Sequence, residues 1–222
     1  MAKVLVIAPH MDDEVLGCGG TIGKHVNNRD AIHVIIVANR VYGHKYDAKK
    51  NENERSHVLK AKSILGYEDI TFLDFPDEQL DGMVQNIIIP LEKHMNKLKP
   101  DTVYVPFRGD NNQDHRAIYD AVRVVIRPGA TPFIKNVYMY EISSSTEQSP
   151  PLLGNAFVPN YYVDISDFMD DKLKALSCYK TEVRKYPHPR SLEAVKILAQ
   201  KRGVEIGFKY AEAFMSLRGI WK

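Results

Sequence analysis

Near its N-terminus the chain reads Ala8-Pro9-His10-Met11-Asp12-Asp13-Glu14-Val15-Leu16-Gly17-Cys18-Gly19-Gly20. The apolar run 4–7 comes directly before this segment, and a short continuous apolar run is typical of a buried strand. A helix can begin at about residue 15, which leaves the polar residues in the loop after the strand. Open α/β sheets bind their ligands at the carboxyl ends of their strands. We therefore expect an α/β fold with a functional site in this loop.

Apolar runs alternate with amphipathic segments along most of the chain. The apolar runs predict strands at 4–7, 31–37, 70–75, 102–105, 136–142 and 161–165. The segments between and after them predict helices at 15–26, 47–65, 83–98, 115–126, 167–179 and 191–200, and a short last helix at 210–217. This order predicts one domain over residues 1–222, a three-layer α/β/α fold with a Rossmann-like, mostly parallel sheet.

Composition indicates an ordinary globular protein, with 44% apolar and 26% charged residues. A net charge of +2 gives no reason to expect a nucleic-acid partner. We expect no leader peptide, no membrane insertion and a cytoplasmic location, because no apolar run approaches the length of a membrane span. Cys18 and Cys178 are too few for a disulfide framework, and we expect Cys18 to be packed rather than metal-bound. A homo-oligomer is compatible with these data.

The first loop has the composition of a metal site. Its acidic side chains would repel one another unless a cation lay among them. His10 and Asp13 can bind one metal ion, and such a nitrogen and oxygen set suits catalytic zinc. Asp12 can then stay unligated and act as a general base. The competing interpretation is a plain helix start, where acidic residues are also favoured, but a cap needs only one carboxylate.

A dinucleotide-binding loop is a weaker interpretation of the same glycine-rich segment. Its third glycine would fall at Ile22, and the acidic side chains would occupy the place of the pyrophosphate.

A second polar segment follows the predicted fourth strand and reads Arg108-Gly109-Asp110-Asn111-Asn112-Gln113-Asp114-His115-Arg116. It is expected to face the same crevice, so His115 can be the third metal ligand. Asp114 is suited to hydrogen-bonding a ligand from behind, and Asp110 is a further candidate to face the crevice. The competing interpretation is a helix start with Asp114 as the N-cap.

The two segments together resemble the PIG-L (LmbE-like) family of zinc-dependent N-acetylglucosaminyl deacetylases. The resemblance rests on the His-x-Asp-Asp-Glu run at His10 and on Asp114-His115-Arg116. It implies a Zn²⁺ ion, for which Fe²⁺ could substitute in the cell, and a small amino-sugar substrate that loses its N-acetyl group. Where the family often has a histidine for acid catalysis or oxyanion stabilisation, this chain has Asn112, which can donate a hydrogen bond but no proton.

His188 is our candidate to replace that histidine. It lies in the turn Tyr186-Pro187-His188-Pro189-Arg190-Ser191. We expect it to reach the zinc crevice, hydrogen-bond Asp114, and stabilise or protonate the tetrahedral intermediate. The competing interpretation is a surface turn with a helix N-cap at Ser191.

Substrate contacts follow from the resemblance. Arg55 resembles the arginine that binds sugar hydroxyls, and Asp77 resembles its acidic companion; Asp110 and Asn112 are the other candidates. The long polar segment 143–160 is interpreted as a lid that faces the sugar.

Two other functions stay open. A Mg²⁺-dependent phosphohydrolase could use Asp12, Asp13 and Glu14, although two histidine ligands speak against magnesium. A non-catalytic sugar-binding protein of the same fold would account for Asn112.

Overall fold

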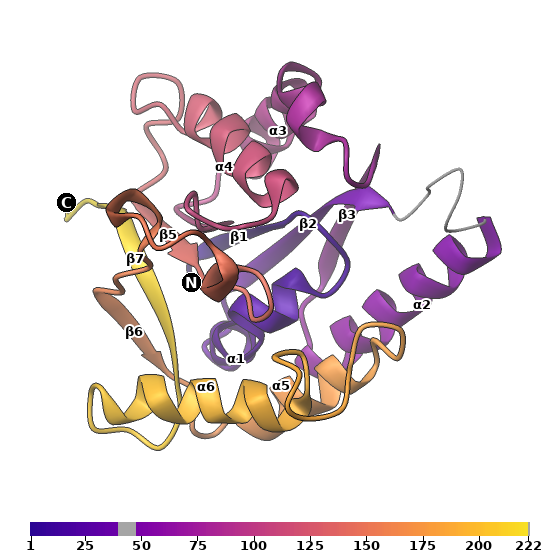
Figure 1. Ribbon diagram of the computed structural model, residues 1–222. Helices are drawn as coiled ribbons and strands as arrows, with labels where there is room; N and C mark the ends of the chain where they lie inside the picture. The colour runs from indigo at the N-terminus through magenta and orange to yellow at the C-terminus, as the bar shows by residue number, and fades with distance from the viewer. Residues whose placement is uncertain (40–47, 222) are drawn as a thin grey trace.

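The computed structural model describes residues 1–39 and 48–221. Within these residues a seven-stranded sheet lies between two layers of helices (Figure 1). The strands are β1 (Lys3–Ala8), β2 (Ala31–Asn39), β3 (Asp69–Pro76), β4 (Thr102–Pro106), β5 (Asn136–Tyr140), β6 (Tyr161–Asp164) and β7 (Ala211–Gly219). Their order is β3-β2-β1-β4-β5-β7-β6, and β1 to β5 are parallel whereas β7 is antiparallel to both neighbours. The predicted three-layer fold with a mostly parallel sheet is confirmed.

Helices cover both faces of the sheet. They are α1 (Asp13–Asn27), α2 (Ala48–Leu65), α3 (Val84–Leu98), α4 (Gln113–Val125), α5 (Met169–Ser177) and α6 (Leu192–Val204). In Figure 1, α3 and α4 lie on one face, and α1, α5 and α6 lie on the other with α2 beside them. The predicted start of the second helix at Asp47 lies outside the described residues.

The central strand β1 is apolar throughout because both of its faces are buried. Val4, Val6 and Ala8 belong to the core beneath α1, whereas Leu5 and Ile7 belong to the core beneath α3 and α4. This two-sided burial is the reason why the strand reads as a continuous apolar run rather than as an alternating one. Cys18 is packed in the first of these cores, as expected.

The predicted helix at 210–217 is wrong, because this segment forms β7. Residues 211–217 are mostly good helix formers, which misled the local prediction. The segment is instead paired on both sides, Met139 with Met215 on β5 and Tyr162 with Ala213 on β6. Tertiary pairing of this kind overrides local propensity.

No helix among the described residues has both the length and the hydropathy that crossing a membrane requires.

Candidate active site

The two polar segments meet at the carboxyl ends of neighbouring strands. Strands β1 and β4 are hydrogen-bonded in parallel, so the loops that follow them open at the same edge of the sheet. The first loop leads into α1 and the second into α4. The N-cap of α4 is Asn112, whose side-chain oxygen accepts the Asp114 N–H at 2.8 Å. The cap is therefore not Asp114, and the carboxylate of that residue is free to serve the site.

Three donor atoms form a nearly equilateral triangle in this site. The distance from His10 Nδ1 is 3.2 Å to both Asp13 Oδ2 and His115 Nε2, and the last two atoms lie 3.3 Å apart. A tetrahedral zinc site with bonds near 2.0 Å has ligand–ligand edges of about 3.3 Å. All three residues are buried. The predicted ligand set therefore has the spacing that one zinc-sized ion requires, and its two nitrogens are unlike the all-oxygen sets that Mg²⁺ prefers.

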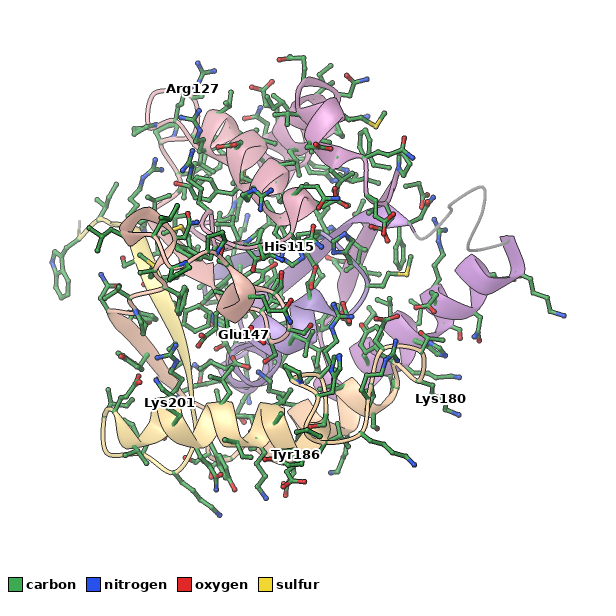
Figure 2. All side chains as sticks on the ribbon, viewed as in Figure 1. His115, Arg127, Glu147, Lys180, Tyr186 and Lys201 are labelled. Carbon is green, nitrogen blue, oxygen red and sulfur yellow. The ribbon has the colours of Figure 1, made fainter. Side chains whose placement is uncertain are left out.

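Figure 2 shows the surroundings of this triangle, with His115 near the centre of the molecule at the start of α4. Carboxylates lie behind both imidazoles. His10 Nε2 is 3.0 Å from Asp114 Oδ2 and 3.0 Å from Asp77 Oδ1, and His115 Nδ1 is 3.1 Å from Asp110 Oδ1. Partners of this kind fix the ring orientation and tautomer of metal-binding histidines. Asp77 and Asp110, predicted as substrate contacts, thus lie behind His10 and His115, and Asp114, predicted to support a ligand, lies behind His10.

The 143–160 segment is tied to this arrangement. The hydroxyl groups of Ser145 and Thr146 donate to the Asp110 carboxylate, the second at 2.6 Å. A cavity of about 440 Å³ lies beside the segment, lined by Glu141, Thr146 and Arg202 together with apolar side chains that include Phe157. The role of the segment as a lid stays a prediction.

Charge is concentrated in the site. Burial disfavours an imidazolium, but the hydrogen bonds to Asp114, Asp13 and Asp77 raise the pKa of His10 well above its usual value. Burial acts in the same way on His115, and there the Asp13 charge and the Asp110 contact raise the pKa to about 9. Burial would raise the pKa of Asp13, but the two histidines hold it well below its usual value. The carboxylates thus attract positive charge into a closed space, which is the condition a cation site needs.

Asp12 lies beside the triangle but does not belong to it. Its side chain is buried, and its backbone has φ 139° and ψ −22°. A non-glycine residue rarely adopts such a positive φ, and outliers of this kind cluster at functional sites. Asp12 makes no side-chain cap hydrogen bond to α1, so the plain helix-cap interpretation of this residue fails. Arg190 Nη1 lies 3.4 Å from Asp12 Oδ2.

Glu14 is also buried, and its carboxyl oxygens have partners outside the triangle. Its Oε2 accepts the Asp12 N–H at 3.2 Å, and its Oε1 accepts a hydrogen bond from the Tyr179 hydroxyl. Burial raises the pKa of Glu14 to about 8.

The structure does not support the expected contact of His188. The side chain is exposed, and its Nδ1 accepts the Arg190 N–H at 3.0 Å. The predicted hydrogen bond to Asp114 is wrong, because the Asp114 carboxylate lies in the interior against His10 and accepts the N–H groups of Glu78 and Leu80. The turn around His188 lies on the surface instead. Its surface-turn interpretation, with an N-cap at Ser191, agrees with the hydrogen bond from the Ala194 N–H to Ser191 Oγ.

Arg55 is placed differently from what the resemblance implies. Its guanidinium forms an ion pair with Asp74 and lies over the ring of Phe72, whereas Asp77 lies against His10. Three further residues that meet around Asp12 and Glu14 were not predicted from the sequence: Tyr179, Glu182 and Arg190. Arg190 could have been noticed in the turn quoted around His188, but no local pattern distinguishes a tyrosine that meets Glu14 across the fold.

Comparisons with known proteins place the chain in a family. The profile of the PIG-L family, described as GlcNAc-PI de-N-acetylase, matches residues 5–126, more than half of the chain. The chain belongs to the PIG-L family. The matched residues include both loops of the site, whereas Tyr179, Glu182 and Arg190 lie beyond them.

Relatives of this PIG-L chain include deacetylases. It is 28% identical over 235 residues to the diacetylchitobiose deacetylase of Thermococcus kodakarensis, covering 99% of this chain and 84% of the relative. Among solved structures, the conserved protein TT1542 from Thermus thermophilus has a TM-score of 0.81 at 25% identity, covering 100% and 97% of the two chains. The N,N'-diacetylchitobiose deacetylase from Pyrococcus horikoshii has a TM-score of 0.74 at 23% identity, covering 98% and 84%.

Proposed function

We propose that this PIG-L protein is a zinc-dependent hydrolase that removes the N-acetyl group from an N-acetylglucosamine-type sugar. The observation that carries the proposal is the triangle of His10, Asp13 and His115. The buried carboxylate of Asp12, the residue before Asp13, is not one of its three donor groups. Family membership and the deacetylase names of the relatives support the reaction and the substrate class.

A bound zinc ion would lower the pKa of a water molecule and polarise the acetyl carbonyl. The other tasks belong to the chain. Asp12 takes a proton from the attacking water while the water oxygen forms a bond to the carbonyl carbon. The carbon–nitrogen bond then breaks, the amine nitrogen receives a proton, and acetate and the free amino sugar leave. Asp77, Asp110 and Asp114 hold the two imidazoles in place during these steps.

The proton for the leaving amine has two candidate sources. Asp12 can return the proton that it accepted, and His188 is our second candidate. The amide oxygen of Asn112 caps α4, and its amide group has no acidic proton to give. His188 is exposed two residues from Arg190, which contacts Asp12, so its turn borders the site. If turnover of His188→Ala stayed within about threefold of wild type, this role would be contradicted, since a positioned acid contributes roughly 10²–10⁴.

Arg55 and Asn112 are the proposed sugar contacts. Arg55 is half-buried and reaches Asp74 at the end of β3, beside the loop that carries Asp77. Asn112 stands directly before α4 and the ligand His115.

The test is acetate release by zinc-loaded protein. The panel contains free, nucleotide-linked and glycosidic N-acetylglucosamine compounds. Asp12→Ala is the inactive variant, and Asp170→Ala, an exposed aspartate on α5, is the matched control. We expect release that requires zinc and Asp12 and survives Asp170→Ala. Equal release by Asp12→Ala would contradict the mechanism, and bound sugar with no release would favour the non-catalytic alternative.

A further inference from the structure

The backbone of Asp12 needs a restraint. Its φ of 139° lies in a region that side-chain-bearing residues avoid, and such a conformation persists only where the surroundings impose it. The residue is nearly fully buried, so solvent does not supply this restraint. Two side chains from the part of the chain between α5 and α6, far from Asp12 in sequence, act on it: Tyr179 through Glu14, and Arg190 directly.

The first contact runs through Glu14 to the peptide of Asp12. Glu14 Oε2 accepts the Asp12 N–H at 3.2 Å, and the Tyr179 hydroxyl donates to Oε1 of the same carboxyl group. Glu14 and Tyr179 each have 0% exposure. Tyr179 is itself fixed, because its N–H donates to the Leu176 carbonyl at 3.0 Å in the last turn of α5.

The second contact reaches the carboxylate of Asp12. Arg190 Nη1 lies 3.4 Å from Asp12 Oδ2 and donates to Glu182 Oε2 at 2.5 Å. Its Nε donates to the Ser144 hydroxyl at 2.6 Å. One planar guanidinium thus joins the first loop, the segment after β5 and the segment after α5. Such a fork loses little freedom when it is held at several points.

We propose that Tyr179 and Arg190 are positioning residues for Asp12, Tyr179 through Glu14 on the peptide and Arg190 directly on the carboxylate. This inference rests on the proposed role of Asp12 as the general base. Both residues lie outside the segment 5–126 that matches the family profile. The base would accordingly be set by the C-terminal third of the chain, whereas the metal ligands come from the two loops of the N-terminal part.

Tyr179→Phe tests the contact through Glu14 in zinc-loaded protein. Tyr104→Phe is the matched control, because Tyr104 is equally buried and its hydroxyl meets His25 Nε2 at 3.1 Å, away from Asp12. We expect Tyr179→Phe to lower kcat about tenfold with KM and zinc content unchanged, because a misplaced base weakens the chemical step and not the binding of substrate. Tyr104→Phe should keep kcat within about twofold.

Variants at Glu14 and Arg190 separate positioning from folding. Glu14→Gln keeps an oxygen that can accept the Asp12 N–H and should retain most of the wild-type kcat, whereas Glu14→Ala should lose as much as Tyr179→Phe. Arg190→Met should lower kcat about tenfold, whereas Arg218→Met, which loses a hydrogen bond to the Ile126 carbonyl, should not. Equal activity of Glu14→Gln and Glu14→Ala, or of the two arginine variants, would overturn the proposal.

A readout without substrate distinguishes this inference from the proposed function. Amide hydrogen exchange at Asp12, followed by NMR in zinc-loaded protein, should be at least about tenfold faster in Tyr179→Phe than in wild type or Tyr104→Phe. Absence of turnover in wild type would refute the proposed function. Hydrogen exchange at Asp12 would still test whether Tyr179 restrains the Asp12 peptide. Unchanged exchange at Asp12 would overturn the route through Glu14, even if kcat fell.

Discussion

The two ring nitrogens of His10 have different partners, and this division explains why the residue is suited to a metal. Nε2 faces Asp114 and Asp77, whereas Nδ1 faces Asp13 and His115. A neutral imidazole carries one N–H, and a carboxylate at Nε2 keeps that proton there. The lone pair of Nδ1 is then available to a cation.

The first prediction concerns the carboxylate behind His10. Asp114→Asn should weaken zinc affinity about 10–100-fold, because the amide supports the imidazole less well than the carboxylate. Competition with a chelator measures this change. Asp120→Asn on the same helix is the control, since Asp120 faces Arg123 and not the site. Equal affinities of the two variants would contradict the supporting role of Asp114.

The second prediction concerns Glu14 and pH in metal-free protein. The folded pKa of about 8 lies above the unfolded value of about 4.3, so between them only the folded state holds the proton. The folding stability from this group is therefore present below pH 4 and falls as pH rises toward 8.

The glutamine side chain of Glu14→Gln does not titrate, so this variant does not lose folding stability in this way as pH rises. Its unfolding free energy should rise relative to wild type by up to about 1.4 kcal/mol per pH unit between about pH 5 and 8. Denaturant titrations at the two ends of this range measure the difference, with exposed Glu193→Gln as the control. Parallel pH curves for wild type and Glu14→Gln would contradict the shift.

At the scale of elements, α1 is held close to the sheet by its glycines. A Cβ at Gly17 would lie 2.3 Å from the ring of Tyr140, and one at Gly20 would lie 2.7 Å from Ile165. Glycine lowers helix propensity, yet here it allows an approach that a larger residue would block. This close packing brings the start of α1, with Asp13, against the end of β1.

The third prediction tests this approach. Gly17→Ala should destabilise the protein by about 1–3 kcal/mol through overpacking, although alanine favours the helix by about 1 kcal/mol. Thermal or denaturant unfolding measures it. Gly82→Ala, where an added Cβ meets nothing within 4 Å, should be neutral or stabilising. Increased stability of Gly17→Ala would show that α1 can move away from Tyr140.

At the scale of the molecule, the site lies where the sheet changes direction. From β1 the chain builds β2 and β3 on one side, and then returns to place β4 and β5 on the other. The helices that follow β1 and β4 therefore lie on opposite faces of the sheet, and the crevice between them is where open α/β sheets bind ligands. His10, Asp13 and His115 and the carboxylates behind them converge at this point from the loops after β1, β3 and β4.

The fourth prediction follows from the proposed zinc site, whose ligands come from the loops after β1 and β4. Zinc at about 1,000 times its dissociation constant should stabilise the folded protein by about 4 kcal/mol. Calorimetry with zinc and with a chelator should show a higher Tm in zinc, and His115→Ala should lose most of the difference. An equal Tm of wild type with zinc and with chelator would contradict the metal site.

Much of the site could be predicted because its parts are local. The buried run before His10 and the polar run before His115 each mark a strand followed by a loop, and parallel neighbours bring such loops together. The approach of His10, Asp13 and His115 to one another follows from this arrangement. The resemblance to the PIG-L family rests on the same two runs, and it is confirmed.

The supporting contacts depended on the tertiary structure. Neither the strand at 211–219 nor the meeting of Glu14 with Tyr179 has a local signal, because both depend on surfaces that exist only after the layers have packed. The same holds for Arg190 on Asp12 and for Asp77 behind His10. Local periodicity thus determined the layers and the ligand loops of this protein. Long-range packing decided which buried polar groups pair. A buried charge must be paired or hydrogen-bonded, and the assembled fold determines which partners lie within reach.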